Sequence, residues 1–333
     1  MRNSDHRVCN RSGVERRKVV LGAAGLLAAA AGGVPAFRAL AERRGLTTRT
    51  RAGIALGTTI SFTLAGTELR VLEAALGNAF RAVRQVEAAA SLFRPDSGLS
   101  RLNRDGRLAD PDPLLVMLLR FGLDLARATD GAFDPTVQPL WPLWAKAAAK
   151  GTRPSDAALA EAVGRVGWQD VTINEEAIGF ERPGMGVTLN ALVQGFAADQ
   201  AMAAIAAHGI ADAFIDTGEF GARGSHPDGT PWRLGIADPR APSALAEVVV
   251  PFTGFAATSG DYAMSFSPDS SDHHIFDPRT GRSPHGLSSA TVTAPTGLLA
   301  DGLSTAVFVL GEAGGRRLVA QYPDCTMRII AKA

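Results

Sequence analysis

Apolar and polar positions follow two different periods along this chain. Residues 58–64 alternate between apolar and polar side chains, as a strand with one buried face does. Residues 69–93 instead repeat Leu, Val and Phe at intervals of three and four, which predicts an amphipathic helix. Further helices are expected over 114–128, 155–166, 191–208 and 298–310. A hairpin is expected over 171–180, and short strands over 214–216, 232–236, 246–252, 290–294 and 327–330.

The order of these elements favours an α+β fold. The strands gather in the second half without the regular alternation of strand and helix that builds a doubly wound parallel sheet. The chain shows no internal repeat and no long linker. We therefore expect residues 42–333 to form a single large domain, in which helices pack on a mixed, largely antiparallel sheet.

The first 41 residues have the pattern of an export signal. Arg16, Arg17 and Lys18 precede a stretch from Val19 to Phe37 that carries no charge. Adjacent arginines favour the twin-arginine route to the periplasm. Cleavage is expected near 39–41 or 34–36. The alternative is an uncleaved membrane anchor, because 19 uncharged residues just suffice to span a bilayer.

Composition excludes several functional classes. The 333 residues are 46% hydrophobic and 20% charged, which suits an ordered core. Without residues 1–41 the chain holds 27 basic and 31 acidic side chains and no basic stripe, which argues against nucleic-acid binding. Only two cysteines are present, Cys9 and Cys325, so a disulfide scaffold or a zinc ribbon is not expected. The P-loop, dinucleotide-binding, nucleophile-elbow and zinc-protease motifs are all absent from the sequence.

Two polar segments in the first half allow two interpretations each. Residues 91–103 form either a solvated loop that restarts a helix or part of a site. Residues 129–136, followed by the aromatic run 139–144, form either a ligand-stacking turn or a helix stop whose tryptophans fill the core. Composition alone does not separate these alternatives.

Two more such segments lie in the second half. Residues 272–281 hold two His, two Asp and one Arg, a set that suits either a surface turn or acid–base chemistry. Asp301 and Thr305 are four residues apart, so on a helix they share one face. A carboxylate and a hydroxyl placed in this way could hold a hard cation such as Mg²⁺, although Asp at a helix start is also favoured by the helix dipole.

Together these segments resemble one known family, the ApbE family of FAD:protein FMN transferases. The resemblance runs from about residue 53 to the C-terminus. It rests on seven segments in order: 91–103, Asp130-Gly-Ala-Phe-Asp-Pro-Thr136, Gln194-Gly-Phe-Ala-Ala-Asp199, Ile215-Asp-Thr-Gly-Glu219, Ala257-Thr-Ser-Gly-Asp-Tyr262, His274-Ile-Phe-Asp-Pro-Arg-Thr-Gly281 and Ala300-Asp-Gly-Leu-Ser-Thr305. The twin arginines, Gln194 and Gly218-Glu219 resemble the NosX-type branch, which is linked to nitrous oxide reductase maturation.

The resemblance implies an activity and a set of site residues. It implies transfer of FMN from FAD to a Ser or Thr hydroxyl of a target flavoprotein, with Mg²⁺ as cofactor and AMP as the released product. The implied metal ligands are Asp301, Thr305 and the backbone carbonyl near Ala191, and the implied base is His274. The implied FAD contacts are Phe93, Ala132, Phe133, Asp134, Thr188, Gln194 and Ile275.

Three positions depart from the family pattern. Thr188 stands where Asp is frequent, Gln194 where Lys or Glu is frequent, and Gly218-Glu219 where Gly-Gly is commoner. These departures put FAD affinity in question. They leave open a pyrophosphatase that releases FMN and AMP, a non-catalytic periplasmic flavin-binding protein, or a purely structural accessory protein.

Overall fold

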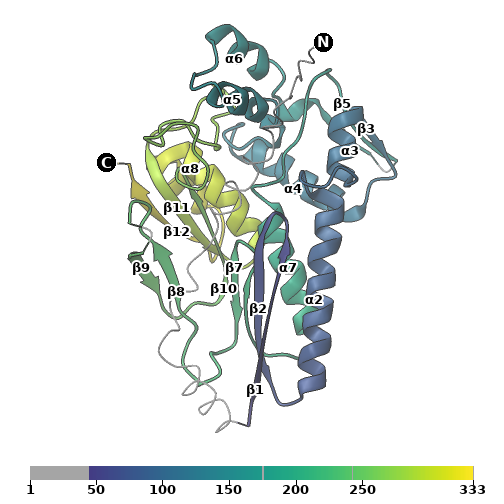
Figure 1. Cartoon of the computed structure of the whole chain (residues 1–333), viewed down its shortest axis with the longest axis vertical. Coiled ribbons are helices and arrows are strands. Elements are labelled where there is room, and N and C mark those ends of the chain that lie inside the picture. Colours follow the sequence, from purple (N-terminus) through teal and green to yellow (C-terminus); the bar gives the residue numbers. More distant parts are fainter. Residues whose placement is uncertain (1–44, 175, 242, 333) are drawn as a thin grey trace, which may run out of the picture.

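The computed structural model describes residues 45–174, 176–241 and 243–332. The export signal expected over residues 1–41 lies outside this range. Figure 1 shows an elongated molecule in which long strands run beside a long helix. The described helices are α2 (Leu69–Ala90), α3 (Gly98–Asp105), α4 (Pro113–Ala128), α5 (Leu140–Ala148), α6 (Asp156–Val163), α7 (Val193–Ala206) and α8 (Gly297–Val319). Two short 3-10 turns cover Pro135–Val137 and Trp168–Asp170.

The main sheet has seven strands, and each pairs with its neighbours in antiparallel fashion. Its order is β1-β2-β6-β7-β10-β11-β12. These strands are β1 (Thr47–Ala55), β2 (Thr58–Gly66), β6 (Asp212–Asp216), β7 (Phe220–Arg223), β10 (Gly254–Gly260), β11 (Leu287–Ala294) and β12 (Thr326–Ala331). The expected α+β class is therefore confirmed, and the sheet is antiparallel throughout its described pairs.

Two small sheets complete the strands. One has the order β3-β5-β4 and the other pairs β8 with β9, again antiparallel. Their strands are β3 (Arg107–Ala109), β4 (Val171–Ile173), β5 (Ala177–Phe180), β8 (Leu234–Ala237) and β9 (Leu245–Val249). The hairpin expected over 171–180 is β4 and β5.

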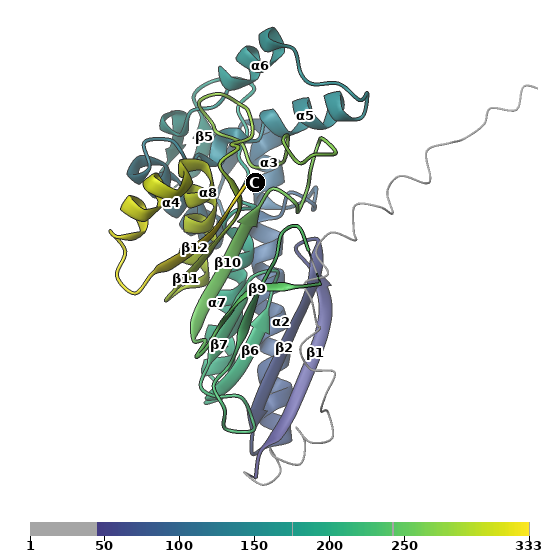
Figure 2. The ribbon, with the colours of Figure 1, turned by 90° about the vertical axis from the view of Figure 1, so that its left-hand side faces the viewer.

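Helices α2, α7 and α8 cover one face of the main sheet. α2 lies against β1 and β2, α7 against β6 and β7, and α8 against β10, β11 and β12. Figure 2 shows α2 and α7 behind the strands in a view turned by 90°. The buried side chains of α2 include Leu72, Leu76, Val83 and Val86, which is the stripe that the sequence predicts. One continuous apolar core lies between the sheet and these helices.

α8 is the one helix in the described ranges that is long and apolar enough to cross a membrane by length and composition. Most of its apolar stretch is buried in this fold, because α8 packs on both α7 and the sheet. Its dihedral angles break at Gly311, where φ is 68°. α8 is thus a core helix bent at a glycine.

α5 and α6 stand above the upper end of the strands in both ribbon views. They enclose a second, smaller core around Trp144, Leu140 and Phe276. The ring of Trp144 stacks on Phe276 and on Phe266, at centroid distances of 6.3 and 6.0 Å. Trp144 therefore fills a core, which is one of the two interpretations of the aromatic run.

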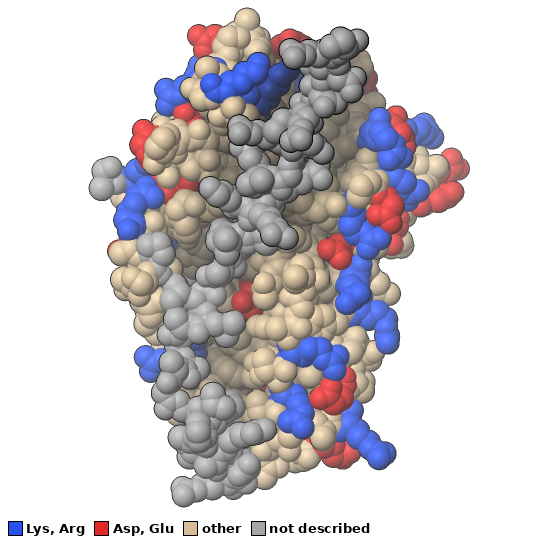
Figure 3. Space-filling model, in the orientation of Figure 1, with Lys and Arg blue, Asp and Glu red and all other residues tan. Residues whose placement is uncertain are grey.

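Charged side chains of both signs are interspersed on the face shown in Figure 3. They lie along both sides of the visible face, many of them on the right-hand edge. The ion pairs Arg51–Glu73, between β1 and α2, and Arg104–Asp105, in α3, have nitrogen–oxygen distances of 2.6 and 2.9 Å. Pairs this exposed contribute little to stability.

Candidate active site

The site begins where α7 crosses α8. Gly195 in the first turn of α7 lies against Gly297 in the first turn of α8. A β-carbon on either glycine would overlap the backbone carbonyl of the other. Only glycine permits this approach. The crossing brings the first turn of α7 beside Asp301, one turn into α8.

Asp301 is buried and points at the backbone of α7. Its Oδ2 accepts a hydrogen bond of 3.0 Å from the amide of Gly195. Burial is the main reason that the pKa of Asp301 is raised to about 7; the Gly195 bond lowers the pKa in part, and the nearby charge of Asp199 contributes to the rise. A buried carboxylate with so little positive charge around it is suited to a bound cation.

The carbonyl of Ala191 is left free by the same contact. In a regular helix the amide of Gly195 would bond to the carbonyl four residues before it, which belongs to Ala191. It donates to Asp301 instead, and within residues 45–332 no hydrogen bond reaches the Ala191 carbonyl. The Asp301 carboxylate thus takes the hydrogen bond that the Ala191 carbonyl would otherwise accept, and this carbonyl oxygen stays available to a ligand.

Thr305 lies one turn after Asp301, on the same side of α8. Its hydroxyl is 2.9 Å from the Ser259 hydroxyl at the end of β10. Carboxylate, hydroxyl and carbonyl oxygens are the hard donors that Mg²⁺ takes in proteins. The described residues hold no group of three or more His, Cys, Asp or Glu side chains suited to a metal, so a cation here depends on the hydroxyl and carbonyl donors. These three donors fit Mg²⁺ with phosphate and water completing its shell.

Gln194 and Glu219 lie at the edge of this group. The Gln194 side chain covers Gly218, where a β-carbon would collide with it, and the Gln194 carbonyl accepts a 2.9 Å bond from the Thr217 hydroxyl. Glu219 accepts a 3.3 Å bond from the amide of Thr258. Burial and the charge of Asp301 raise the pKa of Glu219 well above its usual range. Glu219, whose role the sequence does not indicate, therefore lies within electrostatic reach of Asp301.

His274 is held so that one ring nitrogen stays free. The carbonyl of Met264 accepts bonds of 3.1 Å from both the backbone amide and Nδ1 of His274. Since a carbonyl only accepts, Nδ1 carries the hydrogen and Nε2 keeps its lone pair. Nε2 has no hydrogen-bond partner among the described residues. Burial lowers the pKa of His274, which keeps the ring neutral.

The neighbouring His273 has a structural role. Its ring is fully buried, with Nε2 3.1 Å from the carbonyl of Pro284 and Nδ1 accepting from the amide of Ile275 at 3.4 Å. Both nitrogens are thus used within the loop. Of the two histidines in this segment, only His274 has the free nitrogen that a base needs.

The other predicted FAD contacts are mostly buried. Ala132, Phe133 and Ile275 are buried, so a ligand would meet their backbone or ring edges. The carboxylate of Asp134 accepts bonds from the amide and hydroxyl of Thr136, at 2.7 and 2.6 Å, and from the amide of Trp168 at 3.1 Å. Burial raises the pKa of Asp134. In this structure Asp134 organises the turn rather than facing solvent.

Thr188 and Phe93 complete the predicted contacts. The amide of Thr188 donates a 2.8 Å bond to the carbonyl of Pro135, which joins Thr188 to the turn of Asp134. Phe93 is 68% exposed and lies over Gly57, in the turn between β1 and β2. Within the described residues no hydrogen bond links Phe93 to the other predicted contacts, so its place in the site rests on the resemblance.

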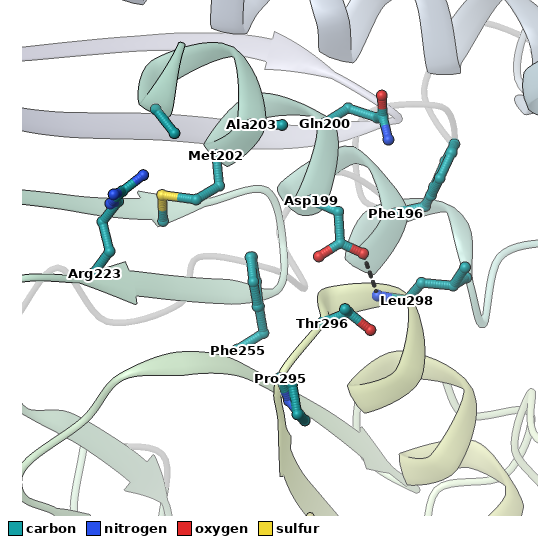
Figure 4. A pocket seen from close by; sticks show the side chains of 11 residues that line it. Phe196, Asp199, Gln200, Met202, Ala203, Arg223, Phe255, Pro295, Thr296 and Leu298 are labelled. Atoms are coloured by element: carbon teal, nitrogen blue, oxygen red, sulfur yellow. Dashed lines mark hydrogen bonds between the residues drawn. The ribbon is translucent and has the colours of Figure 1, made fainter. Parts of the chain in front are cut away.

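Asp199 organises the site although no role was predicted for it. Its two oxygens accept hydrogen bonds of 2.6 and 2.9 Å from the backbone amides of Gly297 and Leu298, which are the first two residues of α8. Figure 4 shows the bond to Leu298 beside an open, mainly apolar hollow of about 400 Å³ between Met202, Phe255 and Pro295. None of the predicted site residues lines this hollow. The presence of Asp199 in the motif Gln194–Asp199 was the one sequence signal for it.

Comparison with known proteins identifies the family of the chain. The family model described as "ApbE family" matches residues 56–329. A Haemophilus influenzae protein named FAD:protein FMN transferase is 33% identical over 69% of this chain and 70% of its own length. A Salmonella typhimurium protein of the same name is 32% identical over 69% of each chain.

Solved structures resemble the whole fold. The flavin transferase ApbE from Vibrio cholerae has a TM-score of 0.74 and 26% identity, over 86% of this chain and 94% of its own. The apo flavinyl transferase ApbE from Pseudomonas stutzeri has a TM-score of 0.73 and 28% identity, over 86% and 92%. The match in sequence and in fold spans nearly all of the described residues, and the chain therefore belongs to the ApbE family.

Proposed function

We propose that this protein transfers FMN from FAD to a Ser or Thr hydroxyl of a target protein and releases AMP. The observation that carries the proposal is the bond from the Gly195 amide to Asp301, which leaves the Ala191 carbonyl free, together with Thr305 one turn further along α8. The shared name of its curated relatives supports the same activity.

The chemistry follows from the residue types. The acceptor oxygen bonds to the phosphorus on the FMN side of the pyrophosphate, and the bond from that phosphorus to the bridging oxygen breaks. AMP departs with the bridging oxygen. A bound Mg²⁺ would offset the negative charge of the pyrophosphate and of the leaving group. Asp301, Thr305 and the Ala191 carbonyl are the residues that would hold it.

His274 is the proposed proton acceptor. A neutral hydroxyl is a weak nucleophile and gains from a base that removes its proton. Nε2 of His274 has a free lone pair, and the bond from Nδ1 to Met264 fixes the tautomer that provides it. The lowered pKa keeps that nitrogen unprotonated near neutral pH.

The test combines a covalent product with a released one. Purified protein is incubated with FAD, Mg²⁺ and a candidate acceptor flavoprotein. Flavin fluorescence on the denatured acceptor, together with AMP, is the expected result. AMP without a fluorescent acceptor in any of several candidates would instead assign a pyrophosphatase, and FAD binding with neither product would assign a binding protein.

Asp301→Asn is the matched variant for this assay. It keeps the shape of the side chain and removes the charge that would anchor the cation. We expect loss of Mg²⁺-dependent transfer, with a melting temperature in the absence of metal no lower than wild type, because a buried charge is removed. Unchanged turnover in this variant would contradict the metal assignment.

We also propose export to the periplasm by the twin-arginine route, and a NosX-type role in nitrous oxide reductase maturation. The paired Arg16 and Arg17 support the first, and Gln194 with Gly218-Glu219 supports the second. Replacing both arginines by lysine should retain the protein in the cytoplasm, as fractionation would show. Flavin labelling of an acceptor from that pathway, in preference to acceptors from other pathways, would support the second proposal.

A further inference from the structure

Three hydroxyl groups join Thr305 to the backbone of its own helix. The Thr305 hydroxyl is 2.9 Å from the Ser259 hydroxyl, and the Ser259 hydroxyl is 3.0 Å from the Ser304 hydroxyl. The Ser304 hydroxyl in turn donates to the backbone carbonyl of Asp301 at 2.9 Å. Ser304 is 1% exposed, so water does not compete for it. The chain of bonds leaves α8 at Thr305, passes through the end of β10, and returns to α8.

The direction of every bond in this chain is fixed by its last member. A carbonyl oxygen only accepts, so the single hydrogen of Ser304 points at Asp301. The Ser304 oxygen can then only accept from Ser259, which uses the single hydrogen of Ser259. The Ser259 oxygen must therefore accept from Thr305. Each hydrogen thus points to the next member of the chain of bonds, from Thr305 to Ser259, from Ser259 to Ser304 and from Ser304 to the Asp301 carbonyl.

This direction determines what Thr305 offers to a ligand. An oxygen of a hydroxyl group has three directions available beyond its carbon, one for its hydrogen and two for lone pairs. With the hydrogen directed at Ser259, both lone pairs face the site. If the bond ran the other way, one lone pair would face Ser259 and the hydrogen of Thr305 would occupy one of the two directions toward a cation.

We propose that Ser259 and Ser304 are positioning residues that fix the Thr305 hydroxyl with its lone pairs toward the divalent cation. This inference rests on the proposed function, because it takes Thr305 as a metal ligand. Ser259 contacts Thr305 directly. Ser304 acts on Thr305 only through Ser259, by holding the hydrogen of Ser259 away from Thr305. The sequence offers no sign of this, since the two serines are 45 residues apart.

The test measures metal binding without FAD or an acceptor. Mn²⁺ is titrated into the full chain, and the concentration of free Mn²⁺ is measured from its electron paramagnetic resonance signal. Ser259→Ala and Ser304→Ala should each raise the dissociation constant of Mn²⁺ about tenfold, the usual effect of removing a partner behind a metal ligand. The double variant should bind no more weakly than either single variant, because one chain of bonds is broken in each case.

Thr291→Ala is the matched control. The hydroxyls of Thr258 and Thr291 form another bond between neighbouring strands, at 2.8 Å, outside this chain. Its loss should lower the melting temperature of the metal-free protein about as much as the serine variants do, and leave Mn²⁺ affinity unchanged. This separates a change in hydrogen direction from general loosening of the sheet.

Three outcomes would overturn the inference. Wild-type Mn²⁺ affinity in Ser304→Ala would overturn the inference, because Ser304 touches the site only through the chain. Equal weakening in Thr291→Ala would overturn it as well, since any lost hydroxyl pair would then suffice. If the wild-type chain and Asp301→Asn bind Mn²⁺ alike, the metal site of the proposed function fails, and the inference falls with it.

Discussion

Gly195 and Gly297 touch backbone to backbone, and this contact sets the distance between the two halves of the candidate metal site. The Gly195 amide reaches Asp301 of α8 only because the helices approach so closely. Ala191 belongs to the α7 side and Thr305 to the α8 side. Any increase in the separation of the helices would move these donors apart.

A β-carbon at Gly195 should therefore cost both stability and metal affinity. Gly195→Ala overlaps a backbone carbonyl that cannot rotate away, and we expect a loss of about 3 kcal/mol in the free energy of unfolding. Urea unfolding measures this. Gly77→Ala in α2 is the control, since nothing lies within 4 Å of its β-carbon, and it should gain about 0.5–1 kcal/mol. Equal stability of the two variants would contradict the close crossing.

Phe93 should contribute to FAD binding and little to folding. Its ring is 68% exposed, so Phe93→Ala removes few core contacts. If the ring stacks on the flavin, FAD affinity should fall about tenfold. Quenching of flavin fluorescence measures the affinity. Met117→Ala, which removes a 52% exposed apolar side chain from α4, should leave it unchanged. Unaltered affinity in the Phe93 variant would remove Phe93 from the site.

His274→Ala should slow transfer about 10²- to 10⁴-fold and change FAD affinity much less, as expected when a general base is lost. Because burial lowers the pKa of His274, its ring should stay unprotonated at pH 6.5. The transfer rate of the wild type should therefore decline only at a pH below 6.5. His208→Gln is a remote control, since the His208 ring bonds to Asn78 at 2.7 Å between α7 and α2. Collapse of FAD affinity in His274→Ala would make this histidine a binding group.

Asp199 should make stability fall as pH rises. Burial raises its pKa to about 6, from 3.8 in an unfolded chain, although two backbone amides bond to it. Between these values the folded protein holds a proton that the unfolded chain has released. The contribution of Asp199 to the free energy of unfolding should therefore decrease from about pH 4 to pH 6, by on the order of 3 kcal/mol.

Asp199→Asn is the variant that tests this prediction. It cannot titrate, so its stability should change less over the same interval, measured by urea unfolding at each pH. Its overall stability should be lower, because the amide offers one acceptor for the amides of Gly297 and Leu298 where the carboxylate offers two. A slope as steep as that of the wild type would show that another group controls this pH range.

The sequence predicts the elements whose periods are clear. β2 alternates and α2 carries its apolar stripe. β1 was missed because its segment 47–55 is rich in Thr and Arg, and β10 because it is built of small residues. α5 was missed because Pro139 and Pro142 suggest a break, although Pro is compatible with the first turn of a helix. The sequence predicts a loop over residues 91–103 that restarts a helix, whereas α3 begins at Gly98, within that segment.

The site was predictable only where its residues are close in sequence. Asp301 and Thr305 show their common face by their spacing of four. The free Ala191 carbonyl, the Glu219 carboxylate and the Ser259 hydroxyl become part of the site through contacts between distant segments. Such contacts leave no periodic signal in one sequence, since they depend on how β7, β10, α7 and α8 pack.

The segment around His274 is shared between the two cores. Asp301 and Thr305 belong to α8 and the main core, which also takes in Ile275, whereas Phe276 belongs to the small core beneath α5 and α6. There Trp144 donates a 2.8 Å bond to the carbonyl of Gly281, which packs tightly against Leu140 and Leu159. Opening of the small core alone would loosen the segment that follows Ile275 while the metal ligands of α8 stay packed. On heating, we therefore expect transfer to be lost at a lower temperature than the fold.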